Sequence, residues 1–301
     1  MENILRHAYL IIAHNEPDLL ATLVHMIDDE RNDIYIHIDS KSDKNQFRDI
    51  KTEHSHLFFV DRIDVRWGDI SQVRAELLLM EVAAGNHKYS FYHIISGVDL
   101  PINSQDYIHG ICEKFQDKSF VGFASGPQNE KDIVNRTGVY HIFTTYCRKK
   151  QIRLLSCIFN NIQKVIGIRR KLHLSENGSE TILKKGCNWC SLTDEAVNYI
   201  LSRKNIILRE FRNTLCPDEL FIQSVLWNSP LRKKLFGYEE CLDEYSMCMR
   251  EIDWDRGSPY TWQMQDFEYL MKSKKFFARK FSSQDLEIVK KIEKAILLNK
   301  P

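Results

Sequence analysis

The amino-acid sequence predicts an α/β fold with a mostly parallel central sheet and helices on both faces. Two observations lead to this class. Short apolar runs that are typical of strands alternate, over residues 1–125, with segments whose apolar residues recur at helical spacing. Each strand-like run is apolar at most positions, as expected when both faces of a sheet are covered.

The first strand is predicted over His7–Ala13. Asn15 or Glu16 then caps a helix that has Pro17 in its first turn, where the missing proline N–H would be unpaired anyway. The turn at 66–69 leads into a helix capped by residue 69 or 71. The remaining elements of this half are strands at 33–38, 57–60, 90–95 and 120–123, and helices through 73–80 and 104–115.

The alternation weakens in the second half of the chain. Arg148–Lys171 is basic and amphipathic, and we interpret it as a helix packed on the domain with a solvated basic face. Contact of this segment with a membrane surface or an acidic partner remains an open alternative. Residues 175–179 are predicted to form an exposed loop. Thr193 is predicted to cap a helix, and Ser282 and Asp285 to form the capping box of the last helix.

Composition excludes several classes of protein. The 42 Lys and Arg residues nearly balance the 41 Asp and Glu residues, so bulk charge does not favour a nucleic-acid partner. Neither a signal peptide nor a transmembrane run is evident. The 8 cysteines are scattered, and Cys187-x-x-Cys190 lacks a second pair at zinc spacing. We therefore expect a cytoplasmic protein with reduced thiols, folded as a single domain over residues 1–301.

Four side chains follow the predicted strands at the points where those strands end. They are His14, Asp39, Trp67 and Asp99. Ligands of parallel α/β sheets bind outside the carboxyl ends of the strands, so the four together indicate a ligand crevice. Each one alone is better explained as an ordinary loop residue. The chain contains no G-x-G-x-x-G after its first strand and no P-loop motif, which argues against dinucleotide and P-loop enzymes.

Two adjacent carboxylates, Asp218 and Glu219, follow Pro217 within the stretch 214–226. One interpretation is ordinary helix-start chemistry, because the helix dipole favours negative charge in the first turn. The other is a general base held on a fixed element. Successive helical side chains point about 100° apart, so Glu219 is the candidate base and Asp218 caps or orients.

Taken together, these residues resemble the core-2/I-branching N-acetylglucosaminyltransferase family, which also contains the peptide O-xylosyltransferases. The resemblance covers nearly the whole chain and depends on the order and spacing of several short motifs. They are the strand His7–Ala13 with His14, Ile36-His37-Ile38-Asp39-x-Lys41, Arg66-Trp67-Gly68, Ser96-Gly97-x-Asp99-x-Pro101-Ile102, Gly186-x-x-Trp189, Pro217-Asp218-Glu219, and Arg256 with Phe277-Ala278-Arg279-Lys280-Phe281.

The resemblance implies a GT-A-type glycosyltransferase that moves a sugar, GlcNAc or xylose, from a UDP-sugar to a glycan hydroxyl with inversion. It implies Glu219 as the general base, and a nucleotide-sugar-binding half (1–125) followed by an acceptor-binding and catalytic half (126–301). The implied donor-binding residues are His14, Asp39, Trp67, Asp99, Arg256 and Lys280, and the implied acceptor-binding residues are Trp189, Asp218 and Trp254.

The resemblance also implies catalysis without a metal ion or other cofactor. The sequence does contain a D-x-D triplet, Asp253-Trp254-Asp255, but it lies late in the chain and not beside the fourth strand. Arg256 and Lys280 would neutralise the leaving diphosphate instead. The chain lacks the disulfide framework and signal-anchor of the animal enzymes, so we expect a bacterial relative. A glycan or lipid-linked oligosaccharide acceptor is expected, with Arg148–Lys171 as a possible contact with the inner membrane face.

Two other functions remain open at this point. A nucleotidyltransferase that makes sugar nucleotides would also use an α/β nucleotide domain, but His14-Asn15-Glu16-Pro17 is not the glycine-rich signature expected after its first strand. A non-catalytic glycan-binding protein could share the same fold. A glycosidase is disfavoured, because neighbouring carboxylates cannot readily flank one bond from opposite sides.

Overall fold

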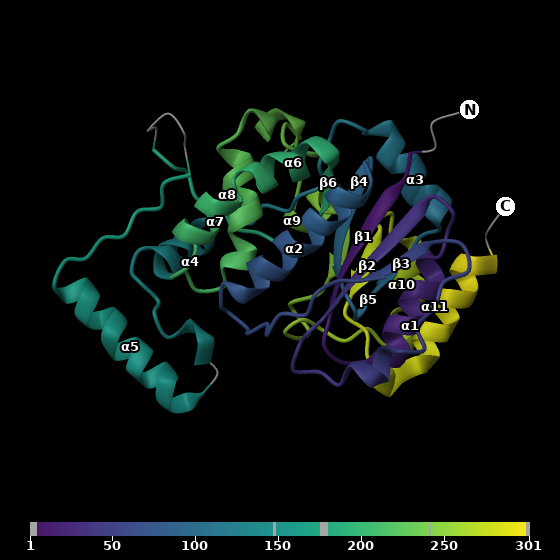
Figure 1. Ribbon diagram of the computed structural model, residues 1–301, viewed down its shortest axis with the longest axis horizontal. Coiled ribbons are helices and arrows are strands. Elements are labelled where there is room, and N and C mark those ends of the chain that lie inside the picture. Colours follow the sequence, from purple (N-terminus) through teal and green to yellow (C-terminus); the bar gives the residue numbers. More distant parts are fainter. Residues whose placement is uncertain (1–4, 147–148, 175–179, 241, 299–301) are drawn as a thin grey trace.

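A five-stranded sheet forms the centre of the molecule (Figure 1). The structure is a computed structural model, and it describes residues 5–146, 149–174, 180–240 and 242–298. Its strand order is β3-β2-β1-β4-β6. The first four of these strands are parallel and β6 is antiparallel to β4. The strands are β1 (His7–Ala13), β2 (Asn32–Ile38), β3 (His56–Phe59), β4 (Phe91–Ser96) and β6 (Ser191–Thr193).

Each face of the sheet carries its own hydrophobic core. Along β1, Leu10 packs into one core and its neighbour Ile11 into the other, because successive strand side chains point to opposite faces. Helices α2 (Ser71–Asn86), α6 (Asp194–Ser202), α7 (Lys204–Glu210) and α8 (Phe221–Trp227) cover the first face. Helices α1 (Pro17–Ile27), α3 (Gln105–Lys114), α10 (Phe267–Lys272) and α11 (Leu286–Leu298) cover the second. The predicted α/β class with a mostly parallel sheet is confirmed.

The predicted start of α6 is confirmed with its side-chain cap, and that of α1 by position, since Glu16 makes no capping hydrogen bond. The cap predicted for α2 at residue 69 or 71 is wrong, because its N-cap is Ile70. Glu16 is the N-cap of α1, and Pro17 occupies the first turn. Thr193 caps α6 by accepting a hydrogen bond from the N–H of Ala196. Ser282 accepts from Gln284 ahead of α11.

The strand predicted over Phe120–Phe123 is wrong. Phe120 makes a single antiparallel bridge with Ser191, and the preceding residue Ser119 pairs with Leu235 instead. The segment therefore changes partner within two residues and cannot extend a ladder. The prediction failed because an apolar run gives no information about which strand edge remains available to it.

A second, three-stranded sheet connects the C-terminal region to the end of β4. Its order is β5-β8-β7, with β5 antiparallel to β8 and β7 parallel to β8. The strands are β5 (Asp99–Pro101), β7 (Arg250–Ile252) and β8 (Phe277–Arg279). The register pairs Asp99 with Arg279. Residues 180 positions apart in sequence therefore meet at the carboxyl edge of the main sheet.

Further short elements complete the described part of the chain. They are α4 (Pro127–Thr137), α9 (Glu244–Met247), and the 3₁₀ turns η1 (Lys44–Phe47), η2 (Thr144–Tyr146), η3 (Pro217–Glu219), η4 (Pro230–Lys234), η5 (Met264–Asp266) and η6 (Ser283–Asp285). Residue 148 and the loop predicted at 175–179 lie outside the described residues.

We expected helix α5 (Lys150–Val165) to pack on the domain, and it does not. Figure 1 shows it, in teal at the lower left, lying apart from the helices that cover the sheet. Its apolar stripe is exposed, including Leu154 at 63% and Val165 at 86%. The contacts of Gln163 run to the backbone of Tyr140, in the segment just before the helix. Among the residues that the structure describes, no helix is both long and apolar enough to cross a membrane.

Candidate active site

Three neighbouring strands carry His14, Asp39 and Asp99 at or just after their carboxyl ends. Asp39 directly follows β2, and its N–H donates to the carbonyl of Ala13, the last residue of β1, at 2.9 Å. The loop after β4 is hydrogen-bonded to β1 in the same way. The structure therefore brings these three predicted residues to one edge of the sheet, where parallel α/β folds bind ligands.

The carboxylate of Asp39 is buried and held by a lysine. Lys41 Nζ lies 2.9 and 2.8 Å from the two Asp39 oxygens and 2.6 Å from Asp64 Oδ1. Asp64 in turn accepts a hydrogen bond from Arg66 at 2.5 Å. This chain of alternating charges fixes the loops after β2 and β3 against each other. The Asp39 oxygens retain lone pairs that could accept hydroxyl hydrogens.

Asp99 links the sheet edge to the C-terminal region. It is 1% exposed, and it accepts hydrogen bonds from the N–H and hydroxyl of Ser96 at 2.9 and 2.7 Å. Arg279 Nη1 donates to Asp99 Oδ1 at 2.7 Å. The guanidinium carbon of Arg279 lies 4.7 Å from the ring centroid of Trp189. Asp99 therefore holds an arginine that stacks on the predicted acceptor-side tryptophan.

The side chain of Glu219 belongs to a cluster of two carboxylates and two cations. Arg136 Nη1 donates to Glu219 Oε2 at 2.6 Å, and Lys185 Nζ lies 3.9 Å from the same oxygen. Both cations also contact Asp132 Oδ2, at 3.0 and 2.7 Å. The cluster fixes the orientation of Glu219, while about a third of the side chain stays exposed.

Backbone hydrogen bonds hold η3 on two sides. Just before this turn, the N–H of Cys216 donates to the carbonyl of Gly68 at 3.1 Å. At its end, the carbonyl of Glu219 accepts from the N–H of Gly186 at 2.9 Å. Both contacts hold tryptophan-containing segments against η3: the loop with Trp67 on one side and the segment with Trp189 on the other.

Asp218 belongs to η3, which lies against helix α2. Burial raises the pKa of Asp218 to about 7, and the charge of Glu219 adds to this effect. Glu76 of α2 is fully buried. Burial raises the pKa of its carboxyl well above the usual value, and the charge of Asp218 is the next cause. Asp218 is therefore partly protonated at neutral pH.

The two predicted phosphate-binding cations differ in their surroundings. Arg256 donates to Asp253 at 2.5 Å and to Asp266 at 2.8 Å, and it lies 4.0 Å from the ring centroid of Tyr260. The N–H of Lys280 donates to the carbonyl of Tyr260 at 3.4 Å. No partner for the Lys280 ammonium group is found within the described ranges of the chain. The same tyrosine residue thus connects the two cations.

The predicted tryptophans differ in what they offer a ligand. Trp67 is 56% exposed and Trp254 is 53% exposed, so each presents part of its ring to the surface. Trp189 is 7% exposed and covered by Arg279. A sugar ring stacked on Trp189 would require Arg279 to move.

Sequence reasoning assigned no role to four cations that contact predicted residues, namely Lys41, Arg136, Lys185 and Arg279. Arg279 lies beside Lys280 in a motif that had been noticed, so its position carried a signal. Arg136 lies 83 residues before Glu219 and on a different element. No local pattern in the sequence marks Arg136 or Lys185, because each meets Glu219 of η3 only in the folded chain.

Comparison with known proteins identifies a family. The family described as Core-2/I-Branching enzyme matches residues 7–279 of the chain. A protein of Ciona intestinalis named xylosyltransferase is 23% identical over an alignment 307 residues long, which covers 96% of this chain and 34% of that protein. The chain thus spans about a third of the length of this curated relative. Among solved structures, the crystal structure of S. aureus TarS aligns with 41% of this chain and 23% of its own, at 9% identity and a TM-score of 0.25.

Proposed function

We propose that this chain transfers GlcNAc or xylose from a UDP-sugar to a hydroxyl of a glycan acceptor. The proposal starts from the family, because the chain belongs to the core-2/I-branching enzyme family and is a glycosyltransferase. In this proposal the transfer inverts the anomeric centre, requires no divalent metal, and uses Glu219 as the general base. The observation that carries the proposal is the position of Glu219. Its backbone is anchored to Gly186 and its carboxylate to Arg136, in a cluster that leaves it partly exposed.

The proposed reaction has one bond forming and one breaking. The acceptor oxygen attacks the anomeric carbon, its proton passes to the carboxylate of Glu219, and the bond to the UDP oxygen breaks. Negative charge then grows on the departing diphosphate, so fixed cations stabilise the transition state more than the ground state. Lys280 is the more available cation, since Arg256 is already bound to two carboxylates.

The cations can be ranked by experiment. We expect Lys280→Met to lower kcat by roughly 10²–10³-fold, the usual loss for one such donor. Arg256→Met is expected to lower kcat less, because the charge of Arg256 is offset by Asp253 and Asp266. Steady-state kinetics of UDP release would measure both. A larger loss for Arg256→Met would reverse the ranking.

The base is tested by Glu219→Gln, which keeps the shape of the side chain and removes its proton acceptor. We expect UDP-sugar binding to persist while kcat falls by about 10²–10⁴-fold. Glu287→Gln, at an exposed position of α11, is the matched control, and we expect it to leave kcat unchanged. Binding without turnover in wild type would support the glycan-binding alternative. Unchanged transfer in Glu219→Gln would remove this residue from the mechanism.

The proposal leaves two donor sugars, xylose and GlcNAc, to be distinguished by experiment. The name of the Ciona intestinalis relative, xylosyltransferase, favours UDP-xylose as the donor. The resemblance of the sequence motifs to N-acetylglucosaminyltransferases favours UDP-GlcNAc. A thermal-shift screen of nucleotide sugars, followed by UDP release with the best binder, would separate them. Tight binding of a non-uridine nucleotide would contradict the UDP-sugar proposal.

Metal independence is proposed from the chemistry of the D-x-D triplet. The first carboxylate, Asp253, accepts hydrogen bonds from the N–H groups of Asp255 and Arg256 and from the Arg256 side chain, so it serves the turn. We expect transfer to continue in excess EDTA. Loss of transfer in EDTA that manganese restores would contradict this.

Helix α5 is proposed as a peripheral contact with an anionic membrane surface on the cytoplasmic side. Its exposed apolar stripe is accompanied by basic residues, including Lys150, Arg153 and Lys164, which is the composition of helices that lie in a lipid interface. We expect co-sedimentation with anionic but not with neutral phosphatidylcholine vesicles. Changing these three residues to Gln should weaken it. Absence of vesicle binding would favour an acidic protein partner instead.

A further inference from the structure

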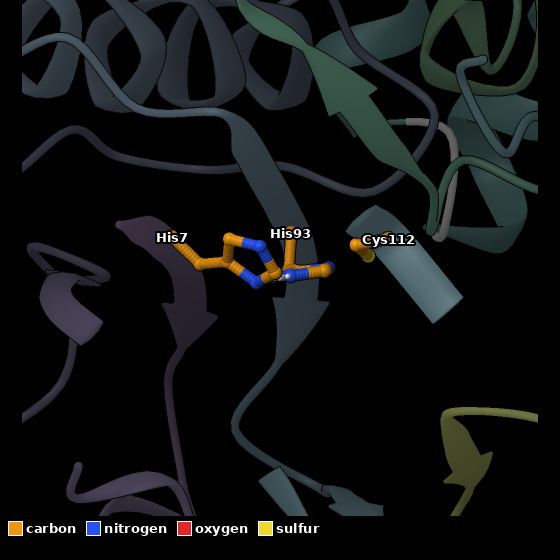
Figure 2. Close-up of side chains that lie close together, drawn as sticks. All are labelled: His7, His93 and Cys112. Atoms are coloured by element: carbon orange, nitrogen blue, oxygen red, sulfur yellow. Dashed lines mark hydrogen bonds between the residues drawn. The ribbon is translucent and has the colours of Figure 1, made fainter. Parts of the chain in front are cut away.

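A second cluster of potential ligands lies at the amino end of the sheet, opposite the proposed active site. His7 begins β1, His93 lies on the neighbouring β4, and Cys112 lies on α3, which covers that face. The parallel register pairs His7 with Phe91, so the two histidines project from the same face two positions apart. Figure 2 shows the two imidazole rings meeting, with the Cys112 side chain next to them.

The three ligand atoms lie close together. One nitrogen of each histidine and the sulfur of Cys112 all lie within 4.8 Å of one another, and the three residues are buried. His7 Nδ1 and His93 Nε2 are 3.0 Å apart. Imidazole nitrogens and a thiolate are the ligands that zinc prefers in proteins. We propose that His7, His93 and Cys112 bind a zinc ion.

The size of the cluster fits this ion with a small adjustment. Zinc bonds of about 2.0–2.1 Å to nitrogen and 2.3 Å to sulfur place tetrahedral ligand atoms roughly 3.3–3.6 Å apart. The histidine nitrogens therefore separate by a few tenths of an ångström, and the sulfur approaches by at most about 1 Å. Rotation of the Cys112 side chain is sufficient for such a change.

Neighbouring groups orient the rings as they do in known metal sites. The other nitrogen of His93 lies 2.8 Å from Ser191 Oγ. His109 stacks on His7 with 3.8 Å between ring centroids, and its own Nε2 lies 2.9 Å from Asn32 Oδ1. Such outer contacts set the tautomer and orientation of ligand histidines.

A cavity supplies access and the fourth ligand. It has a volume of about 1150 Å³ and is lined by residues that include His7, His109 and Cys112. A water molecule from this cavity completes four-coordination. On binding, the Cys112 thiol releases one proton to solvent, and the proton shared between His7 and His93 moves to a nitrogen that does not bind the metal.

The protein must then show metal chemistry that depends on Cys112. Cobalt(II) added to the full chain, after removal of metals with a chelator, is expected to give visible d–d bands and a near-ultraviolet sulfur-to-cobalt band at one equivalent. Zinc is expected to displace cobalt and to raise the melting midpoint by roughly 5 °C at 100 times its Kd. No sulfur-to-cobalt band in the wild-type protein overturns the proposal.

Variants separate this site from the other cysteines. Cys112→Ser should abolish the sulfur-to-cobalt band, while Cys187→Ser, which removes one thiol of the Cys187-x-x-Cys190 pair, should retain it. The reverse result overturns the proposal. If Cys112→Ser does not fold, X-ray absorption of the zinc-loaded wild type decides, with one sulfur and three nitrogen or oxygen neighbours expected. These readouts do not depend on sugar transfer. Repeating the EDTA assay in Cys112→Ser separates loss of this zinc from any metal used in transfer.

Discussion

Gly186 supports the proposed base through a backbone contact that no larger residue allows. A Cβ atom added at this position would lie 2.0 Å from the carbonyl oxygen of Gly122 and 2.7 Å from its carbon. Non-bonded heavy atoms prefer about 3.5 Å, so the two segments must separate by more than about 1 Å. Both clashing atoms belong to the backbone, and no side-chain rotation relieves the contact.

The substitution Gly186→Ala is therefore expected to cost about 2–4 kcal/mol in the free energy of unfolding. Overpacking accounts for about 1–3 kcal/mol, and weakening of the hydrogen bond from Gly186 to Glu219 for about 1 kcal/mol. Because that hydrogen bond positions the turn that carries Glu219, kcat should fall as well.

Urea unfolding and UDP-release kinetics would measure the two effects of Gly186→Ala. Gly85→Ala is the matched control, since a Cβ there meets nothing within 4 Å and the residue lies in α2. We expect the control to be neutral or to stabilise by up to about 1 kcal/mol. A Gly186→Ala protein within about 0.5 kcal/mol of wild type and with normal turnover would refute the reasoning.

Two further predictions concern buried carboxylates. Asp28 accepts hydrogen bonds at 2.6–3.1 Å from the three backbone N–H groups of residues 53–55, and these lower its pKa although burial opposes them. Asp28→Ala should lower the free energy of unfolding by about 1.5–3 kcal/mol at pH 7. Urea unfolding should show this difference becoming smaller as the pH falls through the lowered pKa of Asp28. For Asp218 the sign is opposite: the unfolded carboxyl ionises near pH 3.8 and the folded one near 7, so its contribution to stability declines as pH rises between these values. Urea midpoints from pH 5 to 8 should fall less in Asp218→Asn than in wild type, and equal slopes would contradict the assignment.

The confirmed predictions rest on local signals. β1 is apolar at both alternating sets of positions, and it is buried on both faces. Pro17 begins α1 because its missing N–H and fixed φ suit a first turn, and Thr193 begins α6 by capping it; both signals involve residues within one turn. The common edge for His14, Asp39 and Asp99 followed from the topology of parallel sheets and needed no knowledge of tertiary contacts.

The wrong predictions required knowledge of distant partners. Phe120 forms a single bridge with Ser191, because the preceding residue, Ser119, pairs with Leu235 instead of continuing the same ladder. The apolar stripe of α5, with Leu154 and Ile158, has the same periodicity whether the helix is packed or exposed. Hydrophobic spacing reports the face of a helix but not what lies opposite that face.

The chemistry of the site shows the same limit at the level of charge. From the sequence, Arg256 and Lys280 are equivalent cations that can meet a diphosphate. In the folded chain, Arg256 has two carboxylates within hydrogen-bonding distance, so the sum of these three charges is negative. Lys280 is joined to the same region through Tyr260, and no carboxylate partner offsets its charge among the residues that the structure describes. The electrostatic role of a cation in catalysis thus depends on which carboxylates the fold places around it, a property that no sequence motif encodes.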